Sequence, residues 1–251
     1  MNRILITGGG TGIGRSLAIE LSRRGHHVLA CGRRAGPVKE LKIAHPGIEI
    51  AVCDVSSESD RQRLFEDTKA KLGGLDILVN NAGVQVAQTY GNGSIAHTEL
   101  RSEIDINLIA PMLMVDLFLP LLKEGSDPAI VNLASILALV PKASAPGYCA
   151  SKAGLLNFTR SLRLQLADTP VKMIEVFPPL VETPMTTGRG FSKMSSDQFA
   201  REVADALEAR RPTIAVGEAR RVLRVARWWP SAANYLLNRM IRPSGSSSTY
   251  R

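Results

Sequence analysis

The alternation of short apolar runs with longer helix-patterned segments constrains the fold of this 251-residue chain most. Runs such as DILVN and AIVNL are continuously apolar, which is typical of parallel strands covered by helices on both faces. Strands that alternate with helices predict βαβ units and a parallel sheet. Seven strands are expected, at residues 3–6, 27–31, 48–53, 76–80, 129–133, 172–177 and 213–216. Helices are expected at residues 13–24, 58–71, 98–122, 148–167 and 196–210.

The predicted fold class is α/β, a single Rossmann-like doubly wound domain with a seven-stranded parallel sheet. The length suits one α/β domain of about 250 residues. Hydrophobic residues make up 45% and charged residues 22%, which excludes wholesale disorder, collagen and a coiled-coil rod. The domain is expected to span residues 1–242, and the polar segment 243–251, PSGSSSTYR, is expected to be a flexible tail.

Several classes of protein lack support in the sequence. No apolar run approaches the roughly 20 residues needed to cross a bilayer, and the N-terminal residues do not resemble a signal peptide, so a cytoplasmic location is expected. Cys31, Cys53 and Cys149 are odd in number and widely separated, so they suggest buried packing and not a disulfide framework. The four histidines show no zinc-ligand spacing, and no metal site is expected.

A glycine-rich turn, TGGGTGIG at residues 7–14, separates the first expected strand from the first helix. Glycines at Gly8, Gly12 and Gly14 would let the backbone approach a pyrophosphate, whose charge the N-terminal end of the helix favours. The position of the turn between a strand and an amphipathic helix favours this interpretation. A tight turn without a ligand is the alternative.

The spacing TGxxxGxG and the motifs that follow it resemble the short-chain dehydrogenase/reductase family. These motifs are NNAG at 80–83, Asn107 within a long helix, Ser135 in NLAS, and YCASK with Tyr148 and Lys152. The resemblance spans residues 3 to about 216. Pro179, in FPPLVET, stands where the family usually has glycine. This variant, with YCASK and a GRR after the second strand, resembles a branch that includes the short-chain reductase of bacterial D-alanyl teichoic acid operons.

The resemblance implies catalytic roles for four residues. Tyr148 would donate a proton to a carbonyl oxygen, or accept one from an alcohol, and Ser135 would hydrogen-bond the same oxygen. Lys152 would bond the nicotinamide ribose, and Asn107 would hold a water that passes protons onward. Because Tyr148 and Lys152 are four residues apart, they share a helix face, and the ammonium would favour the phenolate.

Arginines after the second strand predict NADP(H) as cofactor, with NAD(H) less favoured. Dinucleotide folds that choose NAD place an acid there, but residues 26–39 contain none. Arg33 and Arg34 stand where a 2′-phosphate would arrive, with Arg15 as a third candidate. A solvated basic turn is the alternative. The residues expected to bind the cofactor are Thr7, Gly8, Gly12, Ile13, Gly14, Arg15, Arg33, Arg34, Asp54, Val55, Asn81, Ala82, Gly83, Tyr148, Lys152, Pro178, Val181 and Thr183.

The net charge of +8 is concentrated near the C-terminus, where residues 201–251 hold ten arginines, no lysine and four acidic residues. One helical segment sorts its side chains into Arg220, Arg221, Arg224 and Arg227 on one arc and Val222, Val225, Ala226 and Trp229 opposite, before Pro230. Three interpretations stay open: a helix that closes the domain or a subunit contact, a wall of the substrate pocket, and peripheral contact with an anionic membrane. No nucleic-acid partner is expected, because no reader motif accompanies the charge.

The resemblance implies an NADP(H)-dependent oxidoreductase that transfers hydride between nicotinamide and a small-molecule carbonyl or secondary alcohol. Residues 84–97, a lid at 179–195 and the C-terminal helices would select the substrate. A partly apolar pocket is suggested by Val84, Val86, Met185, Phe191 and Met194. The resemblance also implies a homodimer or homotetramer through the helices that begin near Thr98 and Tyr148. The alternative is an NADP-binding regulatory protein with little turnover.

Overall fold

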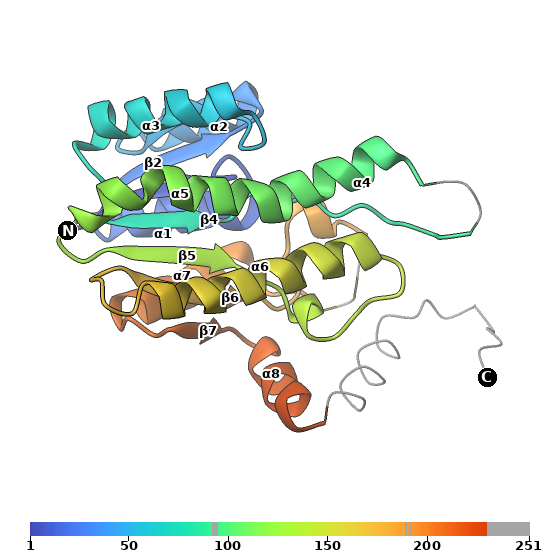
Figure 1. Cartoon of the computed structure of the whole chain (residues 1–251). Coiled ribbons are helices and arrows are strands. Elements are labelled where there is room, and N and C mark those ends of the chain that lie inside the picture. The colour runs from blue at the N-terminus through green and yellow to red at the C-terminus, as the bar shows by residue number, and fades with distance from the viewer. Residues whose placement is uncertain (92–94, 189, 191, 230–251) are drawn as a thin grey trace.

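The computed structural model describes residues 1–91, 95–188, 190 and 192–229, without the side chain of Arg227 (Figure 1). The seven strands form one parallel sheet in the order β3-β2-β1-β4-β5-β6-β7. They are β1 (Arg3–Thr7), β2 (His27–Gly32), β3 (Glu49–Val52), β4 (Ile77–Asn80), β5 (Ala129–Leu133), β6 (Lys172–Phe177) and β7 (Thr213–Ala215). The predicted fold class is confirmed. The expected tail at 243–251 and Phe191 lie outside the described residues.

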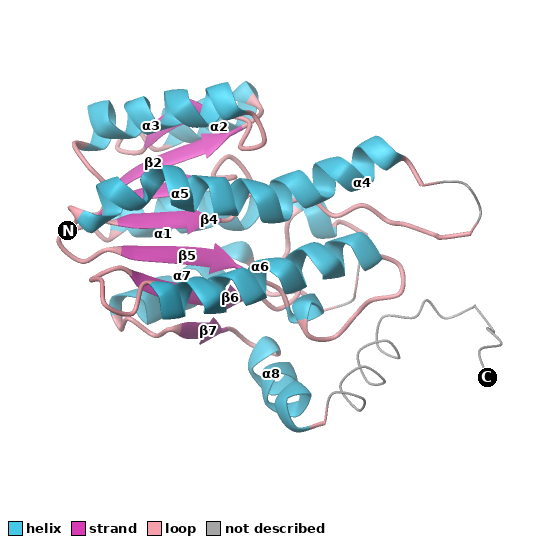
Figure 2. Cartoon of the chain, in the orientation of Figure 1, coloured by secondary structure: helices cyan, strands magenta, loops and turns pink. Residues whose placement is uncertain are grey.

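Helices cover both faces of the sheet (Figure 2). They are α1 (Gly12–Arg23), α2 (Ala35–Ala44), α3 (Glu58–Leu72), α4 (His97–Ile104), α5 (Ala110–Lys123), α6 (Pro146–Gln165), α7 (Ser196–Glu208) and α8 (Ala219–Trp228). A π-helical segment, η1 (Asp105–Ile109), joins α4 to α5, and two 3₁₀ turns are η2 (Ile136–Ala138) and η3 (Pro184–Thr186).

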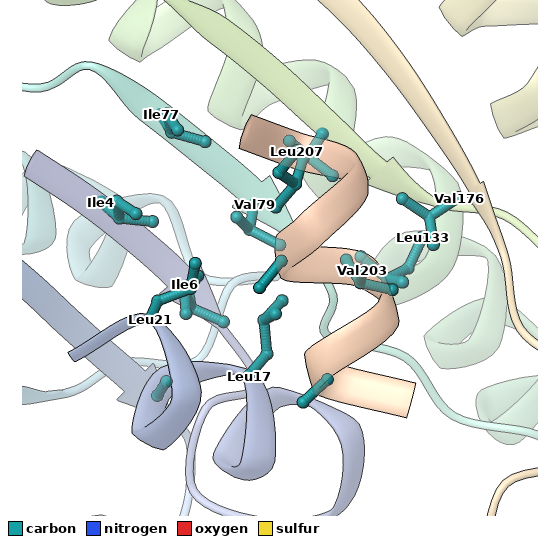
Figure 3. Packing of buried hydrophobic residues seen from close by; sticks show 14 of the residues in the cluster. Ile4, Ile6, Leu17, Leu21, Ile77, Val79, Leu133, Val176, Val203 and Leu207 are labelled. Atoms are coloured by element: carbon teal, nitrogen blue, oxygen red, sulfur yellow. The ribbon is translucent and has the colours of Figure 1, made fainter. Parts of the chain in front are cut away.

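Two apolar clusters hold the layers together, one on each face of the sheet. The first joins the sheet to α1, α2 and α7, as Figure 3 shows for Leu17, Leu21, Val203 and Leu207. The second joins the opposite face to α3, α5 and α6. Successive side chains of a strand point to opposite faces, so Ile4 and Ile6 enter one cluster while Leu5 enters the other. This alternation explains why the strands are continuously apolar.

Two helical features differ from the prediction. Helix α2 is absent from the predicted elements, because Gly36 and Pro37 resemble a turn. Both lie in the first turn of α2, where a backbone N–H has no intrahelical acceptor and proline is tolerated. The single helix predicted at 98–122 is interrupted by η1, which contains Asn107. Such π-helical segments occur frequently at functional sites.

The continuous helical stretch His97–Lys123 has a mean hydropathy of 1.7 over an 18-residue window, enough by length and composition to cross a membrane. The expectation that no apolar segment approaches this length was therefore wrong. The stretch packs against β4 and α6, and it buries the polar side chains of Glu103 and Asn107. Packing explains part of its apolar character: 39% of the window is buried, and Met114, Val115 and Phe118 belong to the core cluster on this face of the sheet.

Helix α8 packs most of its apolar side on the domain, but Trp229, which was expected on that side, is 69% exposed. Val222, Leu223, Val225 and Ala226 contact η2 residues and their neighbours. The arginine side faces solvent, where Arg220 pairs with Glu202 at 2.9 Å and Arg221 with Glu218 at 3.3 Å. Of the three interpretations of this segment, the structure favours the helix that closes the domain.

Candidate active site

A cavity lies where the parallel strands end, bounded by the loops that follow β1 to β6. Its volume of about 480 Å³ lies in the range typical of small-molecule sites. In doubly wound folds, ligands bind outside the carboxyl ends of the strands near the point where strand order reverses, here between β1 and β4. Predicted residues that line the cavity are Gly8, Gly12, Ile13, Gly14, Arg33, Arg34, Asp54, Val55, Asn81, Ala82, Gly83, Tyr148, Lys152, Pro178 and Thr183.

The glycines of the first turn have no room for a side chain. A Cβ on Gly14 would lie 2.3 Å from the Gly8 carbonyl oxygen and 2.4 Å from Asn81 Nδ2. Gly8 and Gly12 also have φ values of +66° and +54°, a region that side chains disfavour. The turn therefore exposes bare backbone beside the N-terminus of α1, and this arrangement fits the pyrophosphate of a dinucleotide.

Thr7 and Asn81 shape this end of the cavity by joining two loops. Thr7 does not line the cavity, but its Oγ1 accepts hydrogen bonds from the backbone N–H groups of Asn81 and Ala82, both at 3.0 Å. In return, Asn81 Nδ2 donates to the carbonyl oxygens of Thr7 at 2.8 Å and Gly8 at 3.2 Å. The glycine turn and the NNAG motif thus form one hydrogen-bonded unit.

The far end of the cavity carries the arginine pair. Arg33 and Arg34 follow β2, and both are exposed. Arg33 Nη1 lies 3.8 Å from Asp54 Oδ2, while Asp54 Oδ1 accepts hydrogen bonds from Ser56. Arg15, the third arginine considered, is on α1 and is not among the residues that line the cavity. Two cationic side chains are therefore available beside this part of the cavity.

Tyr148 and Lys152 lie in the first two turns of α6, and both line the cavity. Lys152 is 4% exposed, and its Nζ donates to the Leu133 carbonyl oxygen at 2.7 Å. The same Nζ lies 5.9 Å from the centroid of the Tyr148 ring. Burial lowers the pKa of Lys152 from 10.5 to about 8, because the charged form loses its hydration. The one-face arrangement predicted from the four-residue spacing is confirmed.

Ser135 and Asn107 lie outside the lining. Ser135 follows β5 and begins η2, where its Oγ accepts a hydrogen bond from Leu137 N at 3.1 Å. Asn107 is fully buried, and its side-chain amide bonds both the N–H and the carbonyl of Val84, at 2.9 and 2.8 Å. In this structure Asn107 therefore holds the loop after β4. This contact was not predicted: the role implied for Asn107 was to hold a water.

Some of the lining was not predicted. It includes Gly10, Thr11, Gly32, Pro37, Cys53, Ile106, Leu133 and Ala134. Val84 and Met185, which were expected in the substrate pocket, do line the cavity, together with Gln85 and Pro184 from the two segments expected to select the substrate. Pro37 belongs to the helix that was not predicted. Met185 was expected to face substrate, whereas Met194 packs on the core, and Val181 is buried and bridges to Met194. Among the described residues, no group of three or more His, Cys, Asp or Glu could hold a metal ion.

The sheet order, the glycine turn and the cavity define a dinucleotide-binding α/β protein of the doubly wound class. The sequence model of the family described as short chain dehydrogenase matches residues 2–208. The chain belongs to this family of oxidoreductases, whose relatives bind nicotinamide cofactors.

The similarity extends over most of the chain. An uncharacterized oxidoreductase DltE of Bacillus subtilis is 38% identical over 213 residues, which cover 82% of this chain and 84% of that protein. A short chain dehydrogenase from Burkholderia cenocepacia, solved in complex with NADP, is 27% identical with a TM-score of 0.82, covering 96% of this chain and 97% of that one. A 3-ketoacyl-(acyl-carrier-protein) reductase from Brucella melitensis, complexed with NADH, shares the fold at 24% identity and a TM-score of 0.78, covering 85% of this chain and 95% of that one.

Proposed function

We propose that the protein is an NADP(H)-dependent oxidoreductase that interconverts a carbonyl and a secondary alcohol through Ser135, Tyr148 and Lys152. The bound cofactor would supply or accept the hydride at nicotinamide C4. Tyr148 would exchange the proton with the substrate oxygen, because its phenol lies in the cavity. The observation that carries this proposal is the buried ammonium of Lys152 at 5.9 Å from the Tyr148 ring centroid.

Lys152 would tune Tyr148 through charge. An ordinary phenol has a pKa near 10 and is a poor base at neutral pH. A cation at this range in a desolvated site favours the phenolate, and the bond to the Leu133 carbonyl fixes where the cation lies. Because the pKa of Lys152 is lowered to about 8, the ammonium stays charged at pH 7 but loses its charge in mildly alkaline solution.

Ser135 would hydrogen-bond the same substrate oxygen. Its Oγ accepts from Leu137 N, which fixes the rotamer of the hydroxyl and leaves its hydrogen for donation. Among the described residues, none accepts a hydrogen bond from that hydroxyl. A donor held in this way would stabilise negative charge as it develops on the oxygen.

The preference for NADP(H) would come from Arg33 and Arg34. Both line the cavity at the end of β2, and guanidinium groups bind phosphate through paired, charge-assisted hydrogen bonds. Only Asp54 among the lining residues is acidic, and its half-buried carboxylate lies 3.8 Å from the exposed guanidinium of Arg33. A 2′-phosphate would meet two cations there, whereas a 2′-hydroxyl would offer neither arginine a negative charge.

Calorimetric titration with NADPH and then NADH tests this proposal without knowledge of the substrate. We expect NADPH to bind at least about tenfold more tightly, which is about 1.4 kcal/mol. The double variant R33A/R34A should lose that preference with NADH affinity unchanged, and the exposed Lys39→Ala on α2 serves as the charge control. Tighter binding of NADH to the wild type would refute the cofactor assignment while leaving the family assignment intact.

Turnover on a panel of carbonyl compounds with the preferred cofactor tests the catalytic roles. Tyr148→Phe should abolish reduction while retaining cofactor affinity, because it removes only the hydroxyl. An active Tyr148→Phe enzyme would refute the proton-transfer role.

We also propose self-association through α5 and α6, which carry exposed apolar side chains. Ile109 at the end of η1, Met112 and Leu113 are 37–40% exposed, and Leu164 is 79% exposed. Light scattering should then give at least twice the 27.1 kDa chain mass. A monomer at micromolar concentration would refute this proposal.

A further inference from the structure

Two buried side chains of one helical stretch hold the loop that follows β4, residues 84–88. Asn107 bonds both backbone groups of Val84, as described above, and Glu103 Oε1 accepts from the backbone N–H of Val86 at 2.8 Å. Glu103 and Asn107 are both 0% exposed. Both backbone groups of Val84 and the N–H of Val86 are therefore paired with helix side chains and not with the backbone of a neighbouring strand.

The spacing of these contacts matches helix geometry to strand geometry. Glu103 and Asn107 are four residues apart, which is about 6 Å along a helix. Val84 and Val86 are two residues apart, which is about 6.6 Å along an extended chain, and alternate residues direct their backbone groups to the same side. One face of the helix thus pairs with the loop as the edge of a strand would. A shift of the loop by one residue along the helix would break the contacts of both Glu103 and Asn107.

Glu103 also connects this loop to the start of α6 through Gln88. Glu103 Oε2 accepts from Gln88 Nε2 at 3.1 Å, and Gln88 Oε1 accepts from the backbone N–H of Gly147 at 3.0 Å. Gln88 N also donates to the Ser144 carbonyl at 3.2 Å. Because the Gly147 N–H can only donate, Gln88 must turn its oxygen toward Gly147 and its nitrogen toward Glu103.

This contact supplies a cap that α6 lacks locally. The residue before the helix, Ala145, makes no side-chain capping bond, and the first N–H groups of a helix have no intrahelical partners. Gln88, 59 positions away in sequence, caps one of them. A Cβ on Gly147 would lie 2.7 Å from Glu103 Oε2 and 2.8 Å from both terminal atoms of Gln88, so the two side chains fill the space that glycine leaves.

We infer that Glu103 and Gln88 are positioning residues: their hydrogen-bond relay caps α6 and fixes Tyr148 relative to loop 84–88. Gly147 immediately precedes Tyr148, and the loop contributes Val84 and Gln85 to the cavity, so the relay joins the proton-transferring residue to the cavity wall. Its effect on turnover rests on the proposed function, whereas the cap itself does not. Burial raises the pKa of Glu103, and the bonds from Val86 and Gln88 act in the opposite direction.

The direction of the hydrogen bonds gives a sharp test. In Glu103→Gln, the oxygen of the new amide can still accept from the Val86 N–H, but its NH₂ group then faces the NH₂ group of Gln88. Rotation of the Gln88 amide by 180° would relieve that clash but would place its NH₂ group against the Gly147 N–H. In Gln88→Glu, two carboxylates face each other. The double variant E103Q/Q88E restores every donor–acceptor pair, because the amide at 103 donates to the carboxylate at 88, which accepts from Gly147.

Amide hydrogen exchange at Gly147 and Val86, measured by NMR, reports the relay directly. Loss of a hydrogen bond of about 1–1.5 kcal/mol should speed exchange at Gly147 about tenfold in Glu103→Gln. The double variant should return to within about threefold of the wild type by the same argument. The control is Glu99→Gln, one turn earlier on α4 and exposed, which should leave Gly147 unchanged.

Kinetics on a carbonyl that the wild type reduces provides the second readout. Glu103→Gln should lower kcat while the Kd for NADPH stays unchanged, and the double variant should recover kcat. Unchanged exchange at Gly147 in Glu103→Gln, or no recovery in the double variant, would overturn the relay. If Glu103→Gln does not fold, a folded double variant supports the relay and an unfolded one overturns it. A wild type without turnover would contradict the proposed function alone, because the exchange result stands independently.

Discussion

Replacement of Lys152 by methionine tests the electrostatic cost of the site. A pKa lowered from 10.5 to about 8 corresponds to about 3 kcal/mol that the folded state loses by burying the ammonium, at 1.36 kcal/mol per pKa unit. Methionine removes this cost but also removes the charged hydrogen bond to Leu133, worth about 1.5–3 kcal/mol. We therefore expect Lys152→Met to be within about 1.5 kcal/mol of the wild type at pH 7 while turnover is lost.

The pH dependence makes this prediction specific. Below pH 8, Lys152 is protonated in both the folded and the unfolded chain, so the folded state carries the full cost. Between pH 8 and 10.5 the folded chain loses the proton first, and wild-type stability therefore rises relative to the variant, by about 1.4 kcal/mol per pH unit. Urea unfolding of both proteins at pH 7, 8, 9 and 9.5 measures this difference. A difference that stays constant, as expected for the exposed control Lys39→Met, would refute the buried-ammonium argument.

Further expectations concern the glycine turn and the core. Gly14→Ala should lower the midpoint of thermal unfolding and abolish cofactor binding, because its Cβ would lie 2.3 Å from the Gly8 carbonyl oxygen. Gly36→Ala, whose Cβ would have no atom within 4 Å, should instead stabilise α2 by about 0.5–1 kcal/mol. Cofactor binding retained by Gly14→Ala would contradict the close packing of the turn. Phe199→Ala should lower the free energy of unfolding in urea by about 3–5 kcal/mol, since the side chain is fully buried, and Ile43→Ala, 80% exposed, by less than about 0.5 kcal/mol. Equal losses for the last two would contradict the assigned core.

Features that depend on local pattern could be predicted from the sequence. The strands were identified because both of their faces are buried, and the glycine turn because its residues, its strand and its helix are contiguous. The shared face of Tyr148 and Lys152 followed from a spacing of four residues on one helix. The strand order 3-2-1-4-5-6-7 is implied only by the resemblance to the family, because pairing between distant strands leaves no signal in a single sequence.

Features that depend on partners distant in sequence could not be predicted. Glu103 has the pattern of an ordinary charged helix residue, and nothing in its neighbourhood shows that Val86 and Gln88 bury it. Helix α2 was missed because Gly36 and Pro37 suggest a turn unless the register of the first helical turn is known. The π-helical segment was missed because its sequence, DINLI, is compatible with an ordinary α-helix.

The buried polar groups of the site follow from where it is built. Parallel strands end at the cavity, and their loops leave the sheet with backbone groups that must still find partners. Lys152 bonds the end of β5 at Leu133, and Asn107 and Glu103 bond the loop after β4. An apolar side chain at any of these positions would leave a backbone group unpaired, which costs about 1–3 kcal/mol where the group is buried, as at Leu133. The polar side chains therefore complete the fold at the open edge of the sheet, and in doing so they fix Tyr148 and the cavity wall in one arrangement.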